Sequence, residues 1–246
     1  LFIGDGMGTP QVTATQYYLG AVQNPDATHP IPAALSFSGF PYSGTATTYD
    51  MTSFCPDSAS TATAMASGNK TLSGVLNYNV DKTQSFKLIT EYAKEAGKKI
   101  GVVTSVSLNH ATPAAFYAKS ESRNNYYDIG VQGLKGTTLD YLAGGAFHHA
   151  TGDDKDKPQQ SLYDIATANG WNYVNTVDGI RALNCDSGRV LAVNPDIQDD
   201  DAITYEIDRT RRSAAGEDVL SLADFVTAGT KVLDNDNGFF MMCEGG

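Results

Sequence analysis

The sequence predicts an α/β fold in which a largely parallel central sheet is flanked by helices on both faces. Short apolar runs alternate along the chain with segments of helical periodicity, as expected when helices connect parallel strands. The length of 246 residues suits one large α/β domain with its own core. Polar residues follow several apolar runs, as they do where parallel strands end at a functional edge.

The individual elements are predicted from these runs. Five are expected to be strands: 1–4, Lys99–Thr104, Leu139–Leu142, Val190–Val193 and Phe239–Cys243. Six segments are expected to be helices: Pro10–Val22, Ser58–Ser67, Phe86–Ala96, Pro113–Lys119, Gln160–Asn169 and Leu220–Leu233. The clearest helix is Phe86–Ala96, which Gly97 would end and whose apolar stripe comprises Leu88, Ile89, Tyr92, Ala93 and Ala96. The stretches 24–32 and 152–159 are expected to be surface loops.

Both ends of the sequence are expected to be buried strands. The chain opens directly on Leu1-Phe2-Ile3-Gly4, and it stops at Gly246, soon after the apolar run Gly238–Cys243. We therefore expect residues 1–246 to form a single α/β domain that is a truncated part of a longer protein.

Composition excludes several classes of partner. The 28 acidic and 17 basic residues give a formal charge of -11, and no basic cluster suits nucleic acid or an anionic membrane surface. Cys55, Cys185 and Cys243 are odd in number and far apart, so they predict neither a disulfide framework nor a CxxC metal clamp. No apolar run approaches a membrane span, and nothing resembles a signal peptide.

Polar residues that suit a metal ion follow three of the predicted strands. Asp5 follows the first strand within Asp5-Gly6-Met7-Gly8, His110 and Thr112 follow the second, and Glu244 follows the last. Each alone is more typical of a helix cap or a turn. Together, the Asp, Glu and Thr oxygens are the hard donors that Mg²⁺ prefers.

Ser58 is the candidate nucleophile. In Cys55-Pro56-Asp57-Ser58-Ala59-Ser60, Asp57 or Ser58 begins a helix of small residues. The ordinary interpretation is an N-cap. The alternative is a hydroxyl placed where backbone N–H groups and the helix dipole hold a phosphate.

Activation of this serine is expected to come from a metal. A serine needs a base or a metal to ease its deprotonation. There is no Gly-x-Ser-x-Gly elbow, and only four histidines are available. Arg123 offers the rigid fork of donors that a transferring phosphoryl group needs, although a single arginine is usually a surface residue.

These segments together resemble the alkaline phosphatase family. The resemblance rests on Asp5–Gly8, on Pro56–Ala59 with Thr61–Ala64 and Gly68–Thr71, on His110–Ala115 with Ser122-Arg123, and on Gly238–Gly245. They occur in the family's order, with approximately its spacing, from one end of the chain to the other. The family's parallel α/β fold agrees with the alternating pattern.

The resemblance implies a role for each matching residue. Ser58 would form a phosphoserine, and Arg123 would bind two phosphate oxygens. Metal ligands would be Asp5, Ser58, His110, Thr112 and Glu244, toward two Zn²⁺ and one Mg²⁺, with Asp5 bridging a zinc and the magnesium. Two-metal phosphate chemistry would then activate Ser58 and stabilise the departing alkoxide.

The family pattern varies at one position and is incomplete at others. His110 stands where some members have Asp and others His, so it reaches magnesium directly or through water, or favours zinc or cobalt there. Most of the family's zinc ligands lie beyond the position of Glu244. His148 and His149 are adjacent, so their side chains are expected to point apart, and neither they nor His29 are assigned a metal role.

The leading expectation is a phosphomonoesterase of broad substrate range that works at alkaline pH. The resemblance also implies a periplasmic or secreted homodimer. A relative acting on diesters or sulfate esters is the alternative enzyme, although Ala59 stands where a sulfatase would have Arg after the nucleophile. A non-catalytic phosphate-binding module is the other alternative, favoured if the natural protein had a mass near 26.2 kDa.

Overall fold

The computed structural model describes residues 1–154 and 156–246, so the predicted 152–159 loop is described except for Lys155, which lies outside the described residues. The chain forms two compact units. The sheet unit comprises Leu1–Ile3 and Thr48–Gly246, and the N-terminal unit comprises Gly4–Thr47. Among the described residues, no helix has the length and apolar character that crossing a membrane requires.

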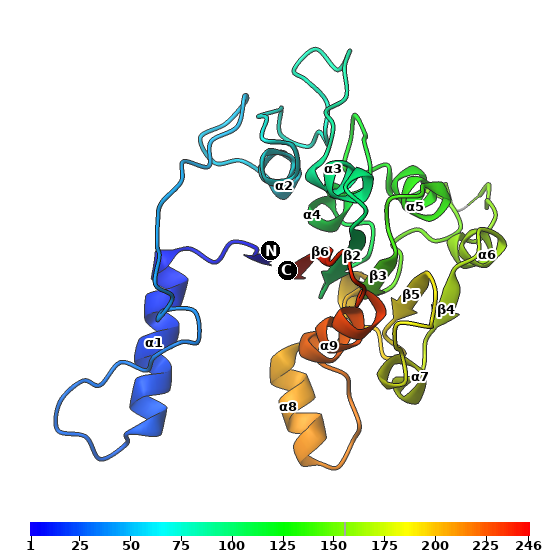
Figure 1. Ribbon diagram of the computed structural model, residues 1–246. Coiled ribbons are helices and arrows are strands. Elements are labelled where there is room, and N and C mark those ends of the chain that lie inside the picture. The colour runs from blue at the N-terminus through cyan, green and yellow to red at the C-terminus, as the bar shows by residue number, and fades with distance from the viewer. Residues whose placement is uncertain (155) are drawn as a thin grey trace. The chain divides into compact units, whose positions relative to one another are not determined.

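A six-stranded sheet organises the sheet unit (Figure 1). Its order is β1-β6-β2-β3-β5-β4. The strands are β1 (Phe2–Gly4), β2 (Lys99–Thr104), β3 (Tyr141–Gly144), β4 (Asn172–Val174), β5 (Val190–Val193) and β6 (Phe239–Gly245). The neighbours β6–β2, β2–β3, β3–β5 and β5–β4 all pair in parallel. The predicted parallel α/β fold is therefore confirmed.

Most predicted strands lie close to their expected positions. β2 and β5 have the predicted bounds, β3 is shifted by two residues, and β4 was not predicted. β6 continues to Gly245, so Glu244 lies within the strand rather than after it. The expectation that the first strand is buried is wrong, because Phe2 is 78% exposed. β1 is an edge strand, bonded through Leu1 to Met241 and Cys243 of β6.

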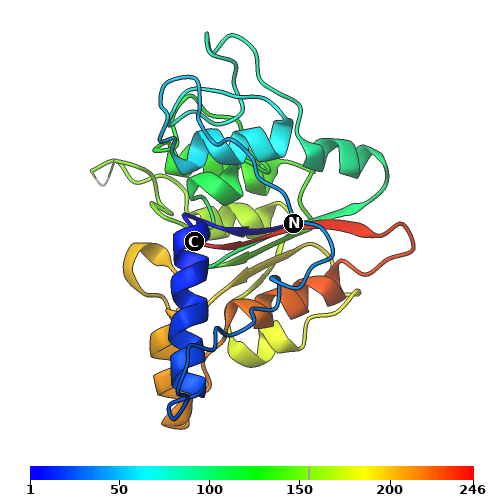
Figure 2. The ribbon, with the colours of Figure 1, turned by 90° about the vertical axis from the view of Figure 1, so that its left-hand side faces the viewer.

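Helices cover both faces of the sheet, as Figure 2 shows for the sheet unit. Successive strand residues point to opposite faces. Val102, Leu142, Leu191 and Met242 contribute to one buried cluster, and the next residue of each strand contributes to the other. The first cluster is completed by α2 (Ser58–Ser67), α3 (Ile89–Glu95), α4 (Ala111–Ala114), α5 (Tyr126–Lys135) and α6 (Leu162–Ala168). The second is completed by α7 (Val177–Arg181) and α9 (Leu222–Val232).

The predicted helices differ from the observed ones mainly at their ends. α2 has the predicted bounds, whereas α3, α6 and α9 are shorter and α4 lies earlier in the chain. The predicted stripe of α3 is wrong, because Ile89 and Tyr92 are exposed while Thr90 is buried. Tyr92 instead lies under the Lys87 ammonium, 4.2 Å from its ring centroid. Gly97 follows the helix with a positive φ of 80°, which explains the stop.

Four further helices of the described residues were not predicted. Two of them, α5 and α7, contribute buried residues to the core clusters. The short 3₁₀ helix η1 (Asp199–Asp201) and the charged helix α8 (Glu206–Ala214) have no buried residues. The N-terminal unit contains α1 (Thr9–Gln23), which is close to the predicted helix. There, Gly20 is required because a Cβ would lie 2.0 Å from the carbonyl oxygen of Ile31.

Candidate active site

The first turn of α2 places the candidate nucleophile. Asp57 is the N-cap, with an extended backbone and a side chain that accepts the Ser60 N–H at 3.1 Å. Ser58 is therefore the first helical residue, and it is half-buried. The small side chains of Ala59, Ala62 and Ala66 are buried, which lets α2 pack closely against α4.

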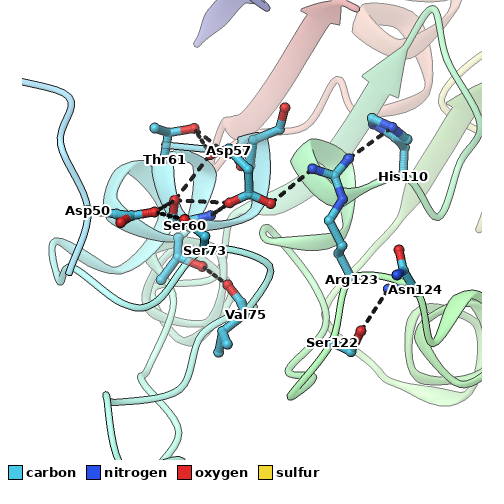
Figure 3. A network of polar contacts seen from close by, with 12 residues as sticks. Asp50, Asp57, Ser60, Thr61, Ser73, Val75, His110, Ser122, Arg123 and Asn124 are labelled. Carbon is cyan, nitrogen blue, oxygen red and sulfur yellow. Dashed lines mark hydrogen bonds and ion pairs between the residues drawn. The ribbon is translucent and has the colours of Figure 1, made fainter. Parts of the chain in front are cut away.

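Arg123 lies beside this turn and is held from several sides (Figure 3). Its Nη1 donates to Asp57 Oδ2 at 3.0 Å, and its Nη2 lies 3.1 Å from His110 Nε2. Its backbone N–H donates to the Gly74 carbonyl at 2.8 Å. Since a guanidinium only donates, Nε2 of His110 is the acceptor in this contact. The structure thus brings Arg123 and His110 to the turn that begins with Ser58.

Asp57 is held as a carboxylate in this arrangement. Its burial acts to raise the pKa, but hydrogen bonds from the backbone of Gly74 and Ser60 and from Arg123 outweigh burial and lower the pKa. An ionised Asp57 orients the guanidinium of Arg123 through a charge-assisted bond. Sequence analysis placed Asp57 only as a helix cap, because the pairing joins residues that are far apart in sequence.

Thr112 and Glu244 lie on neighbouring elements. Thr112 is buried in α4, which packs against both β2 and β6. Glu244 is fully buried on β6, where its Oε2 accepts the Thr104 hydroxyl at 2.5 Å. Thr104 and Glu244 are direct partners in the β2–β6 register. Thr104 was missed by sequence analysis, because only strand register shows which hydroxyl meets the carboxylate.

The buried side chain of Asn109 holds the loop that carries His110. Its Nδ2 donates to the carbonyls of Tyr126 and His148, both at 2.8 Å, and its Oδ1 accepts the His148 N–H at 2.9 Å. A satisfied buried amide of this kind specifies the positions of the segments it joins. The position of His110 is therefore set by the hydrogen bonds of the preceding residue, Asn109, as well as by the contact with Arg123.

The expectation that His148 and His149 point apart is wrong. Their rings stack with centroids 4.2 Å apart, because His149 adopts a positive φ of 52°. His148 Nδ1 lies 2.7 Å from Asp201, and His149 Nδ1 lies 2.9 Å from Asp153. Across residues 1–154 and 156–246, no group of three or more His, Cys, Asp or Glu residues is arranged to hold a metal ion.

The predicted metal ligands are divided between the two units. Asp5 belongs to the N-terminal unit and directly follows β1, whereas Ser58, His110, Thr112 and Glu244 belong to the sheet unit. The carboxylate of Glu244 and the hydroxyl of Thr112 are hard oxygen donors of the kind magnesium prefers. Asp5 and Ser58 alone do not complete a set of zinc ligands.

The parallel sheet, with helices on both faces and a polar cluster at the start of α2, defines the class as an α/β protein. The chain belongs to the alkaline phosphatase family, whose model matches residues 1–246. Alkaline phosphatase 3 of Bacillus subtilis is 31% identical over 255 residues, covering 100% of this chain and 50% of its own length. The chicken tissue-nonspecific isozyme is 29% identical over 288 residues, covering 100% of this chain and 54% of its own.

Solved structures agree with this assignment. A cold-active alkaline phosphatase from Shewanella has a TM-score of 0.79 and 27% identity, covering 99% of this chain and 55% of its own. A histidine-to-glutamate variant of the alkaline phosphatase from the Antarctic bacterium TAB5 has a TM-score of 0.76 and 26% identity, covering 99% and 62%, and holds magnesium in its M3 site. The chain spans about half the length of the curated relatives it matches.

Proposed function

We propose that the protein hydrolyses phosphate monoesters at alkaline pH through a phosphoserine on Ser58, releasing the alcohol and inorganic phosphate. The observation that carries this proposal is the Arg123 guanidinium, held by Asp57 immediately before Ser58. Backbone N–H groups and the positive end of the helix dipole meet at the same turn of α2. Arginine and helix end together suit a dianionic phosphate.

In the proposed reaction, Ser58 forms the covalent intermediate, while Arg123 and Asp57 position the phosphate. The Ser58 oxygen loses its proton and forms a bond to phosphorus, while the bond from phosphorus to the alcohol oxygen breaks and that oxygen is protonated. Water next attacks phosphorus and breaks its bond to Ser58, which regains a proton. Arg123 donates to two phosphate oxygens in both steps, and Asp57 keeps the guanidinium in place.

We propose metal ligands as a further part of this function. Asp5 and Ser58 would be ligands toward two zinc ions, and His110, Thr112 and Glu244 would join Asp5 toward one magnesium, with His110 acting directly or through water. The bound ions would supply Lewis-acid chemistry that eases serine deprotonation and stabilises the leaving oxygen. The oxygen donors of the sheet unit support the magnesium part.

The setting of the reaction is likewise proposed from the family. We infer a periplasmic or secreted homodimer of broad substrate range. Residues 1–246 would act as one catalytic domain in a protein that also contains the family's later zinc-ligand segments. Matches over the whole chain to relatives of about twice its length support this view.

Phosphoserine trapping tests the proposal most directly. The natural-length protein is incubated with labelled inorganic phosphate at acid pH, digested, and its labelled peptide is identified. We expect label on the peptide containing Ser58, and label elsewhere would defeat the assignment.

The variant Ser58→Ala should lower kcat for an aryl phosphate by about 10⁴-fold, since the residue that forms the covalent intermediate is lost. Its bound metal content should stay near normal. Ser67→Ala is a matched control at the other end of α2, where the hydroxyl donates to the Thr63 carbonyl at 2.8 Å and accepts the Asn69 N–H at 3.2 Å. Comparing aryl phosphate, phosphodiester and sulfate ester rates separates the proposed reaction from the alternative enzyme.

A further inference from the structure

One buried carboxylate near the first turn of α2 has no part in the reaction proposed above. Asp50 is 7% exposed. Its Oδ1 accepts the backbone N–H groups of Thr52 and Ser53, both at 2.7 Å. Its Oδ2 accepts the hydroxyls of Ser60, at 2.7 Å, and Ser73. In Figure 3, dashed lines join Asp50 to Ser60 and Ser73 at one end of the network, and Arg123 lies at the other end, beyond Asp57.

The four donors to Asp50 are neutral, yet they keep it ionised. Burial acts to raise its pKa, but the hydrogen bonds from Ser73, Ser60, Thr52 and Ser53 outweigh burial and hold the pKa far below its ordinary range. Hydrogen bonds to an ionised acceptor are shorter and stronger than neutral ones. Asp50 therefore fixes the segments that it joins more firmly than a neutral side chain would.

The first of these segments carries the nucleophile. Ser60 lies in the first turn of α2, two residues after Ser58. Its hydroxyl has one proton, and its contact with Asp50 at 2.7 Å is shorter than those with the carboxylate and carbonyl of Asp57, at 3.1 and 3.2 Å. Asp50 is therefore the main acceptor of the hydrogen bond that the Ser60 hydroxyl donates. Ser60 still donates its backbone N–H to Asp57 Oδ1, so Asp57 Oδ2 faces Arg123.

The second segment contacts Arg123 directly and also contacts Asp57, which holds Arg123. Ser73 donates its hydroxyl to Asp50 and its backbone N–H to Thr52 Oγ1 at 2.8 Å. The next residue, Gly74, accepts the Arg123 backbone N–H at 2.8 Å and donates to the Asp57 carboxylate. A shift of Ser73 would therefore disturb two of the contacts that orient Arg123, those with the Gly74 carbonyl and the Asp57 carboxylate.

We propose that Asp50 is a positioning residue, which sets the first turn of α2 and the Ser73–Gly74 segment in register and so aligns Ser58 with Arg123. The inference rests on the proposed function, because alignment matters only if both residues act on one phosphate. Displacing reacting groups by about 1 Å can cost about 100-fold in rate. Asp50 can therefore have a measurable kinetic effect through its hydrogen bonds with Ser60 and Ser73.

Single-hydroxyl variants separate the two segments. In the natural-length protein, Ser73→Ala should raise KM and the phosphate inhibition constant by about tenfold with a smaller change in kcat, because Arg123 is displaced. Ser60→Ala should lower kcat by about tenfold with a smaller change in the inhibition constant, because Ser58 is displaced. Asp50→Asn should combine both effects and lower kcat/KM by about 10- to 100-fold.

Asp140→Asn is the matched structural control. Asp140 also accepts a backbone N–H, from Ile100 at 2.8 Å, and pairs with Lys94 just before β3. Its loss should lower the melting temperature and leave kcat, KM and phosphate inhibition unchanged. All variants are assayed well below their melting temperatures, so a lower folded fraction does not enter the kinetics.

The outcomes distinguish the two proposals. A folded Asp50→Asn protein with wild-type kcat, KM and phosphate inhibition, or a kinetic loss equal to that of Asp140→Asn, overturns the role of Asp50 alone. If Asp50→Asn does not fold, unchanged kinetics in both serine variants overturn it in the same way. A wild-type protein that neither hydrolyses phosphate monoesters nor forms a phosphoserine overturns the proposed function, and the role of Asp50 with it.

Discussion

Two ion pairs in the sheet unit have similar distances but different surroundings. Asp140 receives the Lys94 ammonium on both carboxylate oxygens at 2.7 Å, just before β3. Asp57 receives one guanidinium nitrogen of Arg123 at 3.0 Å, at the first turn of α2. In both pairs the side chains are about one-quarter to one-third exposed.

The two pairs differ in the hydrogen-bond donors that each cation keeps available for an anion. Lys94 is a compact charge that is neutralised by the two oxygens of Asp140, and Asp140 also caps the Ile100 N–H. Arg123 divides its donors between Asp57 and His110 and, as a planar fork, carries further N–H groups for an anion. An ion pair alone therefore does not identify a site. The proposed site rests instead on a cation that is held in place, keeps donors for an anion and lies beside a serine at a helix start.

Removing each cation should reveal the largest difference in activity between the two ion pairs. Arg123→Ala should lower kcat/KM for an aryl phosphate by about 10²- to 10³-fold, as loss of a preorganised donor does. Lys94→Ala should change kcat/KM by less than about twofold. It should lower the free energy of unfolding by about 1 kcal/mol or less, because its ion pair is partly exposed. Steady-state kinetics and thermal unfolding measure both, and equal kinetic losses would contradict the distinction.

Neutralising Asp57 should give a smaller effect. Asp57→Asn keeps the cap acceptor but loosens the guanidinium of Arg123, so KM and the phosphate inhibition constant should each rise by about tenfold. We expect kcat to fall less, because substrate and product lose the same contact. Phosphate inhibition that matches the wild type would show that Asp57 does not orient Arg123.

The smallest expected effect is a pH dependence of stability at Asp50. Its pKa is lowered in the folded protein, so its stabilisation is complete above the ordinary aspartate pKa and is lost as pH falls through the lowered value. Asp50→Asn should cost about 1–3 kcal/mol at neutral pH. The difference from wild type should shrink below about pH 3.9, the ordinary value. Urea unfolding at several pH values tests this, and a constant difference would contradict it.

Local sequence patterns predicted part of the interior of the sheet unit, although they missed the core helix α5. β2 and β5 are apolar runs buried on both faces, and α2 runs from its Asp57 cap to the left-handed Gly68. β4 was missed because three residues are too few for a periodic signal. α8 was missed because a helix of charged residues without a buried face has no apolar stripe.

The candidate site was only partly predictable from the sequence. Its motif residues lie in recognisable segments, whereas some of the residues that position them do not. Ser58 and Arg123 lie in segments that resemble a family motif. Asp50 lies in no such segment and precedes α2, whereas its partner Ser60 lies within α2 and its partner Ser73 follows it. Only the folded chain shows that these oxygens meet. The stacking of His149 on His148 likewise depends on a left-handed backbone at His149, which the neighbouring sequence did not predict.

The position of β6 has a consequence for how the protein is made. The last strand of this chain lies between β1 and β2, and Thr104 meets Glu244 across a separation of 140 residues. Long-range parallel pairing is slow, because a large loop must close before any contact is gained. During synthesis the edge of β2 therefore stays open until Phe239–Gly245 has emerged. The Thr104–Glu244 pair can form only once β6 has joined the sheet, so a nascent chain can bury much of its core before this pair of oxygen-bearing side chains is in place.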